Sequence, residues 1–512
     1  MTSLPDHLVC LTVHGRTLLE VAEANDLKIP SGCRMGMCGS DPIYILEGSE
    51  NLSAVTSDEQ DTLTRLGLSS KWRMACCARV QGAVVASQTA LEEASNAEPL
   101  EPPDFQVDKG IQDIVIVGNG VAGATAADYI RRYHPECNIT IVAREPYHFY
   151  NRMAVSKLID GGTDLDQITL TPQHWYQEKQ IECLLGSEVV RIDRDRNLVV
   201  TDRRRMLHYD RLLLAMGSGS FIPPIPGWGL SGTFALRDID DALGLRDFAL
   251  FQSCQEAVVL GGGLLGLEAG HALTSLGLHV TVLVRDSSIL QRQLDPECAA
   301  LLLQILRELH IEVLLNTELA MILGDDKVEA VELGDGRVLK CDLFLASVGV
   351  RPAVGLALDA ALNVNRGVVV DDELRTSDMA IYAAGDLAEH RETLYGIWPA
   401  SVEQAKVAAA NLLGDHQSYQ GTIPVTQLKL LGVELVSLGD FNGTDEDQVI
   451  QLIDPEERRY RKLVLNQGRV KGAILLGYPQ EAMAVVRAAK DGLDMSSYVE
   501  DLKVGRWDVI PD

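Results

Sequence analysis

The feature that most constrains the fold is a glycine-rich motif that occurs twice, the second copy 143 residues after the first. Each copy lies between a short apolar run with strand character and a longer run with helix character. Such glycines permit a tight turn, close approach of the backbone to a pyrophosphate, and close packing of a helix whose N-terminus faces negative charge. The glycines are Gly118, Gly120 and Gly123 in the first copy and Gly261, Gly263 and Gly266 in the second. The sequence therefore predicts two dinucleotide-binding folds.

Further motifs assign FAD to the first fold. The strand that follows its helix, beginning at Ile139, ends near Glu145, an acid suited to two ribose hydroxyls. Downstream, Ile381-Tyr-Ala-Ala-Gly385-Asp386 matches the second flavin fingerprint of flavoproteins with two dinucleotide domains. Two shorter segments match their connecting motifs: Ala215-Met-Gly217 and Gly349-Val-Arg-Pro352. One glycine motif alone is a weak signal, but these motifs in this order predict bound FAD.

A cysteine motif near the N-terminus indicates an iron–sulfur centre. Cys33 and Cys38 are separated by four residues, and Cys76 follows Cys38 by 38 residues. This is the C-x4-C-x2-C…C spacing of [2Fe–2S] proteins, except that Asp41 stands at the third position. A carboxylate is a harder ligand than a thiolate, favours ferric iron and should lower the potential. Two alternatives stay open: Cys77 could replace Asp41, or the domain could lack a cluster.

Composition excludes several classes of partner. The formal net charge of −28 makes nucleic acid and anionic membranes poor partners. No apolar run approaches the 18 or so residues of a membrane span, and the first residues lack a signal-peptide pattern. Six of the ten cysteines are scattered singly in apolar surroundings, which predicts buried thiols and a reducing compartment, the cytoplasm. Residues 1–110 carry 16 acids against 8 basic residues, which suits either docking to a basic redox partner or simple solubility.

The predicted fold class is multidomain α/β and α+β, with a β-grasp ferredoxin domain, two Rossmann-like domains and a C-terminal α+β domain. The predicted boundaries are 1–90 for the [2Fe–2S] domain, 91–110 for an acidic, proline-rich linker, 111–228 and 353–420 for the FAD domain, 229–352 for the NAD(P) domain and 421–512 for the C-terminal domain.

Local patterns predict individual elements at both ends of the chain. Near the N-terminus we expect a hairpin over 7–19 turning at Gly15, a helix over Leu19–Asn25, and strands over Ile43–Leu46 and Val80–Ala86. Near the C-terminus we expect antiparallel strands followed by one helix: Gln427–Leu431, Glu434–Gly439, Val449–Ile453, Arg459–Leu465 and Arg469–Leu475, then Pro479–Lys490.

Residues 111–420 resemble the pyridine-nucleotide–disulfide oxidoreductase superfamily, within it the branch of rubredoxin reductases, apoptosis-inducing factors and nitrite-reductase flavoproteins. Tyr150-Asn-Arg152-Met-Ala-Val-Ser156-Lys157 matches the Tyr-x-Arg-x-x-x-Ser-Lys of that branch beside the flavin. The Cys-x4-Cys of the disulfide members and the single cysteine of the peroxidase-like members are absent from the corresponding segments. The resemblance therefore implies a flavin that passes electrons straight to another centre.

The same resemblance implies roles for further residues. Glu268 would pair with Lys157 near the flavin edge that receives hydride, unless it is a surface helix charge. Trp398-Pro-Ala-Ser-Val-Glu403-Gln404 resembles the segment that covers the isoalloxazine ring, where a helix N-terminus would stabilise reduced, anionic flavin. The alternative is a helix start without flavin contact.

The choice of nicotinamide coenzyme is left open by the sequence. In the second fold, Val284 replaces the strand-end acid that selects NADH. Arg285 could bind a 2′-phosphate, but neighbouring Asp286 opposes this.

Residues 1–90 resemble plant-type and adrenodoxin-like ferredoxins. The resemblance implies that Cys33 and Cys38 hold one iron while Asp41 and Cys76 hold the other. With FAD, NAD(P)H and a [2Fe–2S] cluster on one chain, we predict an oxidoreductase with catalytic Lys157 and Glu268 that exchanges electrons with an external protein, as a monomer or homodimer. Two alternatives are a flavoprotein component of a larger nitrite-reductase-like or oxygenase complex, and a redox-sensing interaction protein.

Overall fold

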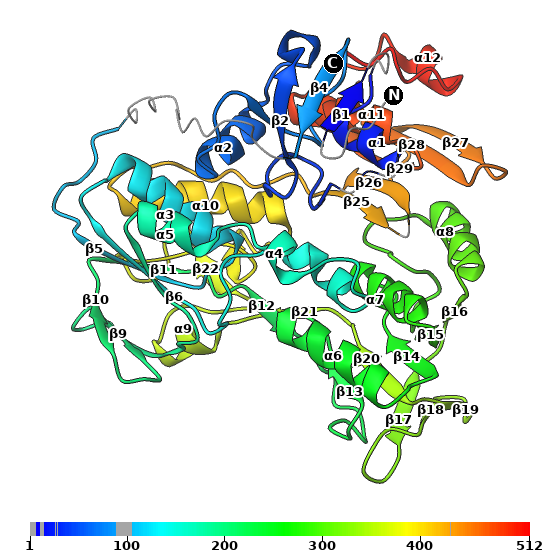
Figure 1. Ribbon diagram of the computed structural model, residues 1–512, viewed down its shortest axis with the longest axis horizontal. Helices are drawn as coiled ribbons and strands as arrows, with labels where there is room; N and C mark the ends of the chain where they lie inside the picture. The colour runs from blue at the N-terminus through cyan, green and yellow to red at the C-terminus, as the bar shows by residue number, and fades with distance from the viewer. Residues whose placement is uncertain are drawn as a thin grey trace. The chain divides into compact units, whose positions relative to one another are not determined.

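The computed structural model describes residues 7–10, 15–25, 27, 29–88, 105–430 and 432–511 (Figure 1). The chain forms two compact units. Unit 1 comprises residues 1–151, 166–218 and 352–422, and unit 2 comprises residues 152–165, 219–351 and 423–512. The chain passes from one unit to the other at 151/152, 165/166, 218/219, 351/352 and 422/423, and the third and fourth of these crossings lie in β12 (Ser218–Ser220) and β21 (Val350–Pro352). In the described ranges no helix is both long and apolar enough to cross a membrane.

Unit 1 begins with a four-stranded sheet in the order β1-β4-β2-β3, in which the paired strands are antiparallel. Its helices supply apolar side chains to a core with Leu18, Ile43, Leu63 and Val84. The elements are β1 (His7–Cys10), α1 (Leu18–Glu23), β2 (Pro42–Glu47), η1 (Ser49–Asn51), α2 (Ser57–Arg65), β3 (Trp72–Met74) and β4 (Val84–Ser87).

The predicted hairpin over 7–19 is wrong in its second arm, because α1 starts at Leu18 and β1 pairs with β4 instead. Thr17 and Glu20 form a capping box, and two reciprocal side-chain bonds to orphan backbone N–H groups favour a helix start over an extended strand. Residues 11–14 lie outside the described part. The last strand also starts later than expected, at Val84, while Val80 forms only an isolated bridge.

The second part of unit 1 is a parallel sheet in the order β23-β11-β5-β6-β7. Its strands are nearly continuous apolar runs, as expected when both faces are covered. The strands are β5 (Asp113–Val117), β6 (Asn138–Val142), β7 (Ile181–Leu184), β11 (Arg211–Leu214) and β23 (Ile381–Ala383). The helices are α3 (Val121–Tyr133), α4 (Leu165–Ile168), α5 (Gln173–Glu178), α9 (Gly355–Asp359) and α10 (Trp398–Leu412). Smaller sheets join β8 (Val189–Asp193) with β9 (Leu198–Thr201) and β10 (Met206–His208), and β22 (Val368–Val370) with β24 (Ala388–His390).

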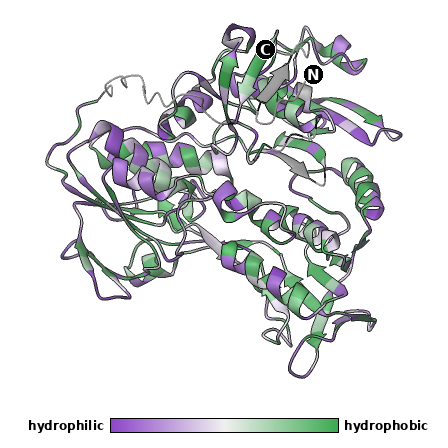
Figure 2. Cartoon of the chain, in the orientation of Figure 1, coloured by the Kyte–Doolittle hydropathy of each residue, from purple (hydrophilic) through white to green (hydrophobic). Residues whose placement is uncertain are grey.

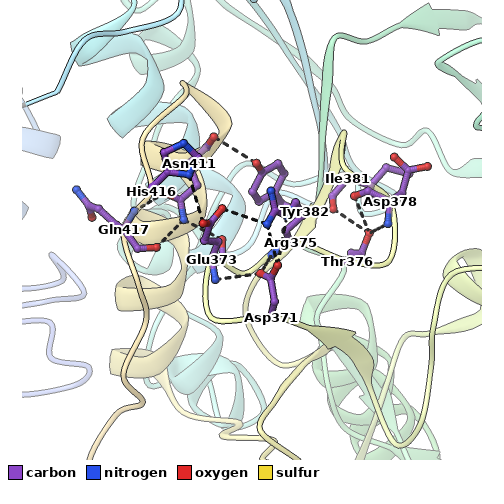
Figure 3. Close-up of polar contacts among 10 residues, drawn as sticks. All are labelled: Asp371, Glu373, Arg375, Thr376, Asp378, Ile381, Tyr382, Asn411, His416 and Gln417. Atoms are coloured by element: carbon purple, nitrogen blue, oxygen red, sulfur yellow. Dashed lines mark hydrogen bonds and ion pairs between the residues drawn. The ribbon is translucent and has the colours of Figure 1, made fainter.

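A polar network braces the end of α10 against the turn before β23 (Figure 3). The Asn411 amide donates to the carbonyls of Glu373, at 2.9 Å, and Gln417, at 2.8 Å. The Tyr382 hydroxyl donates to the Asn411 carbonyl at 3.3 Å. Arg375 pairs with both Asp371 and Glu373 in the same turn. These bonds fix β23, and with it the fingerprint segment that follows.

Unit 2 repeats the parallel arrangement in the order β13-β20-β14-β15-β16, and its strands carry many hydrophobic residues (Figure 2). The strands are β13 (Thr233–Ala235), β14 (Glu256–Leu260), β15 (His279–Leu283), β16 (Ile311–Leu314) and β20 (Leu343–Ala346). The helical segments are η2 (Arg152–Leu158), α6 (Ile239–Phe251), α7 (Leu264–Ser275) and α8 (Pro296–Glu308). A side sheet joins β17 (Leu319–Leu323), β18 (Ala330–Leu333) and β19 (Val338–Lys340).

The C-terminal part of unit 2 is an antiparallel sheet in the order β25-β26-β29-β28-β27, and the structure confirms the five predicted strands and the helix. The elements are β25 (Val425–Leu430), β26 (Val433–Gly439), β27 (Gln448–Asp454), β28 (Arg459–Asn466), β29 (Arg469–Leu476), α11 (Pro479–Lys490) and α12 (Val499–Lys503). Buried Asp295, the N-cap of α8, ties this sheet to the preceding domain by accepting from Lys462 at 2.8 Å and from Tyr460.

Candidate active site and cluster loop

The first glycine loop in unit 1 has the geometry of a dinucleotide cradle. Gly118 has φ +115°, and a Cβ added there would lie 2.2 Å from the Ala215 carbonyl oxygen. A Cβ on Gly123 would lie 2.0 Å from the Gly118 carbonyl oxygen, so only glycine lets α3 pack this closely. Gly120, by contrast, is the N-cap of α3 and faces open space. The loop therefore leaves room for a pyrophosphate beside the uncapped N–H groups of the helix.

Asn119, between the first two glycines, supports the same assignment. Its Oδ1 accepts from the Tyr176 hydroxyl at 2.9 Å. Its Nδ2 is buried and has no hydrogen-bond partner among the described residues. A buried amide donor left unpaired is costly, and a phosphate or ribose oxygen would satisfy it. The residues therefore fit FAD.

The other predicted flavin motifs meet around the same loop. Gly385 has φ +88°, its added Cβ would lie 3.2 Å from the Ala122 side chain, and its N–H donates to buried Gln404 at 2.8 Å. Asp386 accepts from Ser218 at 2.7 Å. Gly217, which has φ +67°, accepts from the Ala353 N–H, and the Ala215 N–H donates to Val117, in the strand before the glycine loop. Unit 1 thus brings the first fingerprint, the second fingerprint and one connecting motif together.

Three remaining residues of the flavin prediction lie in unit 1. Glu145 accepts from the Tyr150 hydroxyl at 2.6 Å, and Glu403 accepts from Thr422. Trp398 is the first residue of α10 and stacks on Phe149 with 5.8 Å between ring centroids. The indole N–H of Trp398 is buried without a hydrogen-bond partner in the described ranges. This unpaired donor next to α3 suits a flavin heteroatom.

The predicted cluster ligands form two pairs. The backbone N–H groups of Cys33 and Cys38 point to each other's sulfur, at 3.4 and 3.3 Å. Asp41 Oδ2 accepts from the Cys76 N–H at 2.5 Å. Across the described ranges, no three His, Cys, Asp or Glu side chains gather as a site for a single metal ion. Two pairs are what a binuclear cluster needs, with one pair for each iron.

Burial and mutual contacts shift the pKa values of these side chains in different directions. Burial raises the pKa of Cys33, whereas the hydrogen bond with Cys33 lowers the pKa of Cys38 to about 6. Burial and the Cys38 charge raise the pKa of Asp41 to about 7. Asp41 Oδ1 is buried and unpartnered within the described ranges, the state expected of an oxygen reserved for iron.

Cys77 is placed differently from the four predicted ligands. Its sulfur lies under Gly36, where an added Cβ would come within 2.6 Å, and 3.9 Å from the Cys76 sulfur. Gly36 has φ +74° and is therefore required both by the backbone and by the close thiol. Cys77 therefore lies next to the cluster loop and stays the alternative to Asp41 as a cluster ligand.

The cluster loop packs directly against the FAD-binding half of unit 1. Cys33, Met37 and Cys38 form one apolar cluster with Val402 of α10, against which Met35, Val121 and Trp398 also pack. Polar links lie around this contact. Asn151 donates to Ser40 at 2.9 Å, the Trp175 indole donates to the Arg65 carbonyl at 2.9 Å, and Lys406 pairs with Asp61.

The second glycine loop, in unit 2, repeats the geometry of the first. Gly261 has φ +118°, and its added Cβ would lie 2.2 Å from the Ser347 carbonyl oxygen. Gly266 would bring a Cβ within 2.4 Å of the Gly261 carbonyl oxygen, while Gly263 faces open space. Gly349, in the second connecting motif, has φ +108° and accepts from the Phe221 N–H at 2.9 Å.

Glu268 on α7 is a carboxylate with a strongly raised pKa. Burial raises its pKa to about 7, although a bond from Ser156 at 3.1 Å and the charge of Lys157 oppose the shift. Ser156 donates a hydrogen bond to Glu268, whereas exposed Lys157 acts on it through its charge. Arg152, in the same segment, donates to the Arg237 carbonyl at 2.9 Å.

Arg285 follows the end of β15 and is 76% exposed. Its contact with Asp286, itself 51% exposed, is long at 3.8 Å. The guanidinium is thus not committed to a strong intramolecular pair.

Sequence reasoning missed the residues that join the cluster loop to the FAD-binding half. Arg65, Asn151 and Trp175 make contacts 110 or 111 residues apart in the chain. Arg65 and Trp175 lie in no recognisable motif, and Asn151 stands at an unspecified position of the Tyr-x-Arg motif. Asn119 could have been noticed, because it lies inside the first fingerprint.

Three family models match the chain. They are a 2Fe-2S iron-sulfur cluster binding domain over residues 7–81, a pyridine nucleotide-disulphide oxidoreductase over residues 112–410, and a rubredoxin NAD+ reductase C-terminal domain over residues 424–492. These matches confirm the resemblance found in the sequence and the cofactor set of FAD, nicotinamide coenzyme and [2Fe–2S] cluster.

Individual relatives agree. The chain is 38% identical to a nitrite reductase [NAD(P)H] of Bacillus subtilis, over 76% of this chain and 48% of that protein. It is 33% identical to a rubredoxin-NAD(+) reductase of Pseudomonas putida, over 73% of this chain and 97% of that protein. Among solved structures, the covalent putidaredoxin reductase–putidaredoxin complex is similar with a TM-score of 0.69 and 28% identity, over 75% of this chain and 94% of that one. The chain spans about half the length of the nitrite reductase it matches.

Proposed function

Because the chain belongs to the pyridine nucleotide-disulphide oxidoreductase family, we propose that it passes electrons between NAD(P)H, FAD, its own [2Fe–2S] cluster and an external redox protein. The observation that carries this proposal is the packing of Cys33 and Cys38 against Val402, beside Trp398 and Val121. Electron transfer needs short distances, and this contact joins the cluster loop to the helices that flank the flavin motifs.

When bound, FAD takes up two electrons as hydride and releases them singly, and the cluster carries one electron at a time. The glycine loops and the N-termini of α3 and α7 would hold the two pyrophosphates. Phe149 and Trp398 exclude water beside α3. Glu268 accepts a hydrogen bond from Ser156 and is attracted by the charge of Lys157, while burial raises its pKa to about 7; when ionised it would stabilise positive charge close to it.

We assign the second iron to Asp41 and Cys76, because the unpartnered Asp41 oxygen is buried at the third ligand position. Asp41→Cys should retain the cluster, shift its charge-transfer bands to the red and raise its potential, since a thiolate replaces a harder oxygen. Asp41→Ala should lower the iron content. Cys77→Ala is the matched control. An unchanged spectrum in Asp41→Ala together with loss of the cluster in Cys77→Ala would assign the iron to Cys77 instead.

A second candidate function is service as the electron-transfer component of a larger reductase. The relative that favours it is an assimilatory nitrate reductase electron transfer subunit of Bacillus subtilis, 35% identical over 75% of this chain and 50% of that protein. The acidic N-terminal segment and the scattered cysteines support a basic protein partner in the cytoplasm, with no role for nucleic acid or membrane. A homodimer is compatible with this assignment.

The test of the function uses the full chain purified without oxygen. FAD, iron and acid-labile sulfide are quantified, and NADH or NADPH is mixed with the protein in a stopped-flow instrument. Bleaching of the flavin followed by reduction of the cluster, and turnover with ferricyanide, are the expected results. Bound flavin that neither coenzyme reduces would contradict the proposal and favour a sensing role.

A further inference from the structure

We infer that Arg65 is a positioning residue that couples the cluster loop to the FAD-binding half and raises the potential of the cluster. This inference rests on the proposed function, because it concerns electron transfer between those two parts of unit 1. Arg65 is the last residue of α2 and is only 5% exposed.

The Arg65 side chain holds the cluster loop by its backbone. Its Nη2 donates to the carbonyls of Met37, at 3.2 Å, and Cys38, at 3.0 Å. The opposite nitrogen, Nη1, is buried and has no hydrogen-bond partner among the described residues. A buried, incompletely paired guanidinium needs a source of negative charge nearby.

The negative charge on the FAD side comes from Asp128 on α3. Its buried carboxylate pairs with Arg132 at 2.5 Å and with Lys179 at 2.8 Å, and it also attracts Arg65. Asp128 thus pairs directly with two cations, and its charge attracts Arg65 while that of Arg132 repels it. The sulfurs of Cys33 and Cys38, when ionised, attract Arg65 as well.

The backbone of Arg65 continues the connection toward the dinucleotide loop. Its carbonyl accepts from the Trp175 indole at 2.9 Å. Trp175 lies edge-on to Tyr176 with 4.8 Å between ring centroids, and the Tyr176 hydroxyl donates to Asn119 in the first glycine motif. A continuous series of contacts thus runs from the cluster loop to the FAD pyrophosphate loop.

Two consequences follow for the transfer of one electron to the cluster, in which one ferric ion becomes ferrous and the reduced flavin loses one electron. First, the contacts of Arg65 keep the loop at a fixed separation from the FAD-binding half. Second, the cluster gains one negative charge on reduction, so a nearby buried cation stabilises the reduced form and raises the potential.

The experiment uses the full chain carrying Arg65→Met, Arg65→Lys or Trp175→Phe, with Lys71→Met as a control that removes an exposed positive charge from the same domain. Three quantities are measured: iron content, the midpoint potential of the cluster by titration followed with EPR, and the rate of cluster reduction after the flavin has been reduced by NADH or NADPH.

We expect Arg65→Met to lower the midpoint potential and to slow cluster reduction at least tenfold, while flavin reduction keeps its wild-type rate. Arg65→Lys should recover the potential, because it restores the charge, but not the full rate, because an ammonium does not reproduce the geometry of the guanidinium. Trp175→Phe should leave the potential unchanged and slow the transfer. Lys71→Met should resemble the wild type.

The inference is overturned if Arg65→Met keeps both the potential and the transfer rate within twofold of the wild type, or if Lys71→Met shifts them equally. If Arg65→Met loses its iron, Trp175→Phe decides, and a wild-type transfer rate in that variant contradicts the coupling. Failure of the proposed function is a separate result, visible in the wild-type chain as a flavin that neither coenzyme reduces.

Discussion

In the two dinucleotide-binding folds the first glycine has nearly the same backbone conformation, with φ +115° at Gly118 and +118° at Gly261. In each fold an added Cβ would lie 2.2 Å from a carbonyl oxygen of a neighbouring segment. Each of these glycines also donates to the last residue of the adjacent strand, Val142 or Leu283. The agreement indicates that the loop backbone forms the binding site for the group that both ligands share, the pyrophosphate.

The side chains around the two loops differ. Asn119 of the first fold corresponds to Gly262 of the second, where a Cβ would lie 2.7 Å from Val284. Seven residues after the first glycine, buried Thr125 of the first fold corresponds to Glu268 of the second. The two folds therefore differ in the side chains around the loop and not in the loop backbone.

The largest effect on stability is expected from a substitution that the common backbone conformation of the two loops does not tolerate. Gly261→Ala places a methyl group against the Ser347 carbonyl in a strained conformation and should cost about 3 kcal/mol or more of stability. Gly263→Ala meets no protein atom within 4 Å, so it should keep the melting temperature and weaken coenzyme binding alone. Thermal melting and coenzyme titration distinguish the two. Equal melting temperatures for both variants would mean that the loop tolerates a side chain at Gly261.

A smaller effect on stability should come from Glu268, the side chain seven residues after the first glycine of the second fold. The folded pKa of Glu268, about 7, exceeds its ordinary value of 4.5. The folded state therefore holds the proton more tightly, and the stability it contributes is complete below about pH 4.5 and lost as the pH rises through 7. The difference between these two pKa values limits the contribution of Glu268 to the pH-dependent stability to about 3 kcal/mol.

Glu268→Gln should flatten the decline of the melting temperature between pH 5 and 8 and slow flavin reduction by the coenzyme. Thr125→Ser, at the matching position of the first fold, should leave the pH dependence unchanged. A wild-type pH profile in Glu268→Gln would remove Glu268 from both roles.

The smallest effect concerns the choice of coenzyme. Arg144 and Glu145 follow β6 as Arg285 and Asp286 follow β15. If Arg285 contacts a 2′-phosphate, Arg285→Ala should weaken the binding of NADPH at least tenfold and leave the binding of NADH unchanged. A charge-assisted hydrogen bond contributes about 1.5–3 kcal/mol. If Asp286 instead repeats the ribose contact expected of Glu145, Asp286→Ala should weaken NADH. Apparent affinities of both variants for both coenzymes separate the two cases.

The parts of the fold that could be predicted from the sequence are those determined by patterns of neighbouring residues. Gly118, Gly261 and the C-terminal strands are recognisable because turn geometry and alternation act over a few residues. The second arm of the N-terminal hairpin was wrong, because the Thr17–Glu20 capping box outweighs an apolar alternation. The docking of the cluster loop could not be predicted, because Arg65 and Trp175 acquire their roles only when distant segments meet.

The contact between the cluster loop and the FAD-binding half also bears on how the chain can be dissected. A truncated chain that starts at Phe105 would deprive the Trp175 indole and the Asn151 amide of their acceptors, each loss costing about 1–3 kcal/mol, and would bare Val402 and Trp398. Such a truncated flavoprotein should tend to aggregate and should be less stable than the same residues in the full chain. The N-terminal domain and the FAD-binding half should therefore unfold together and not as two independent modules.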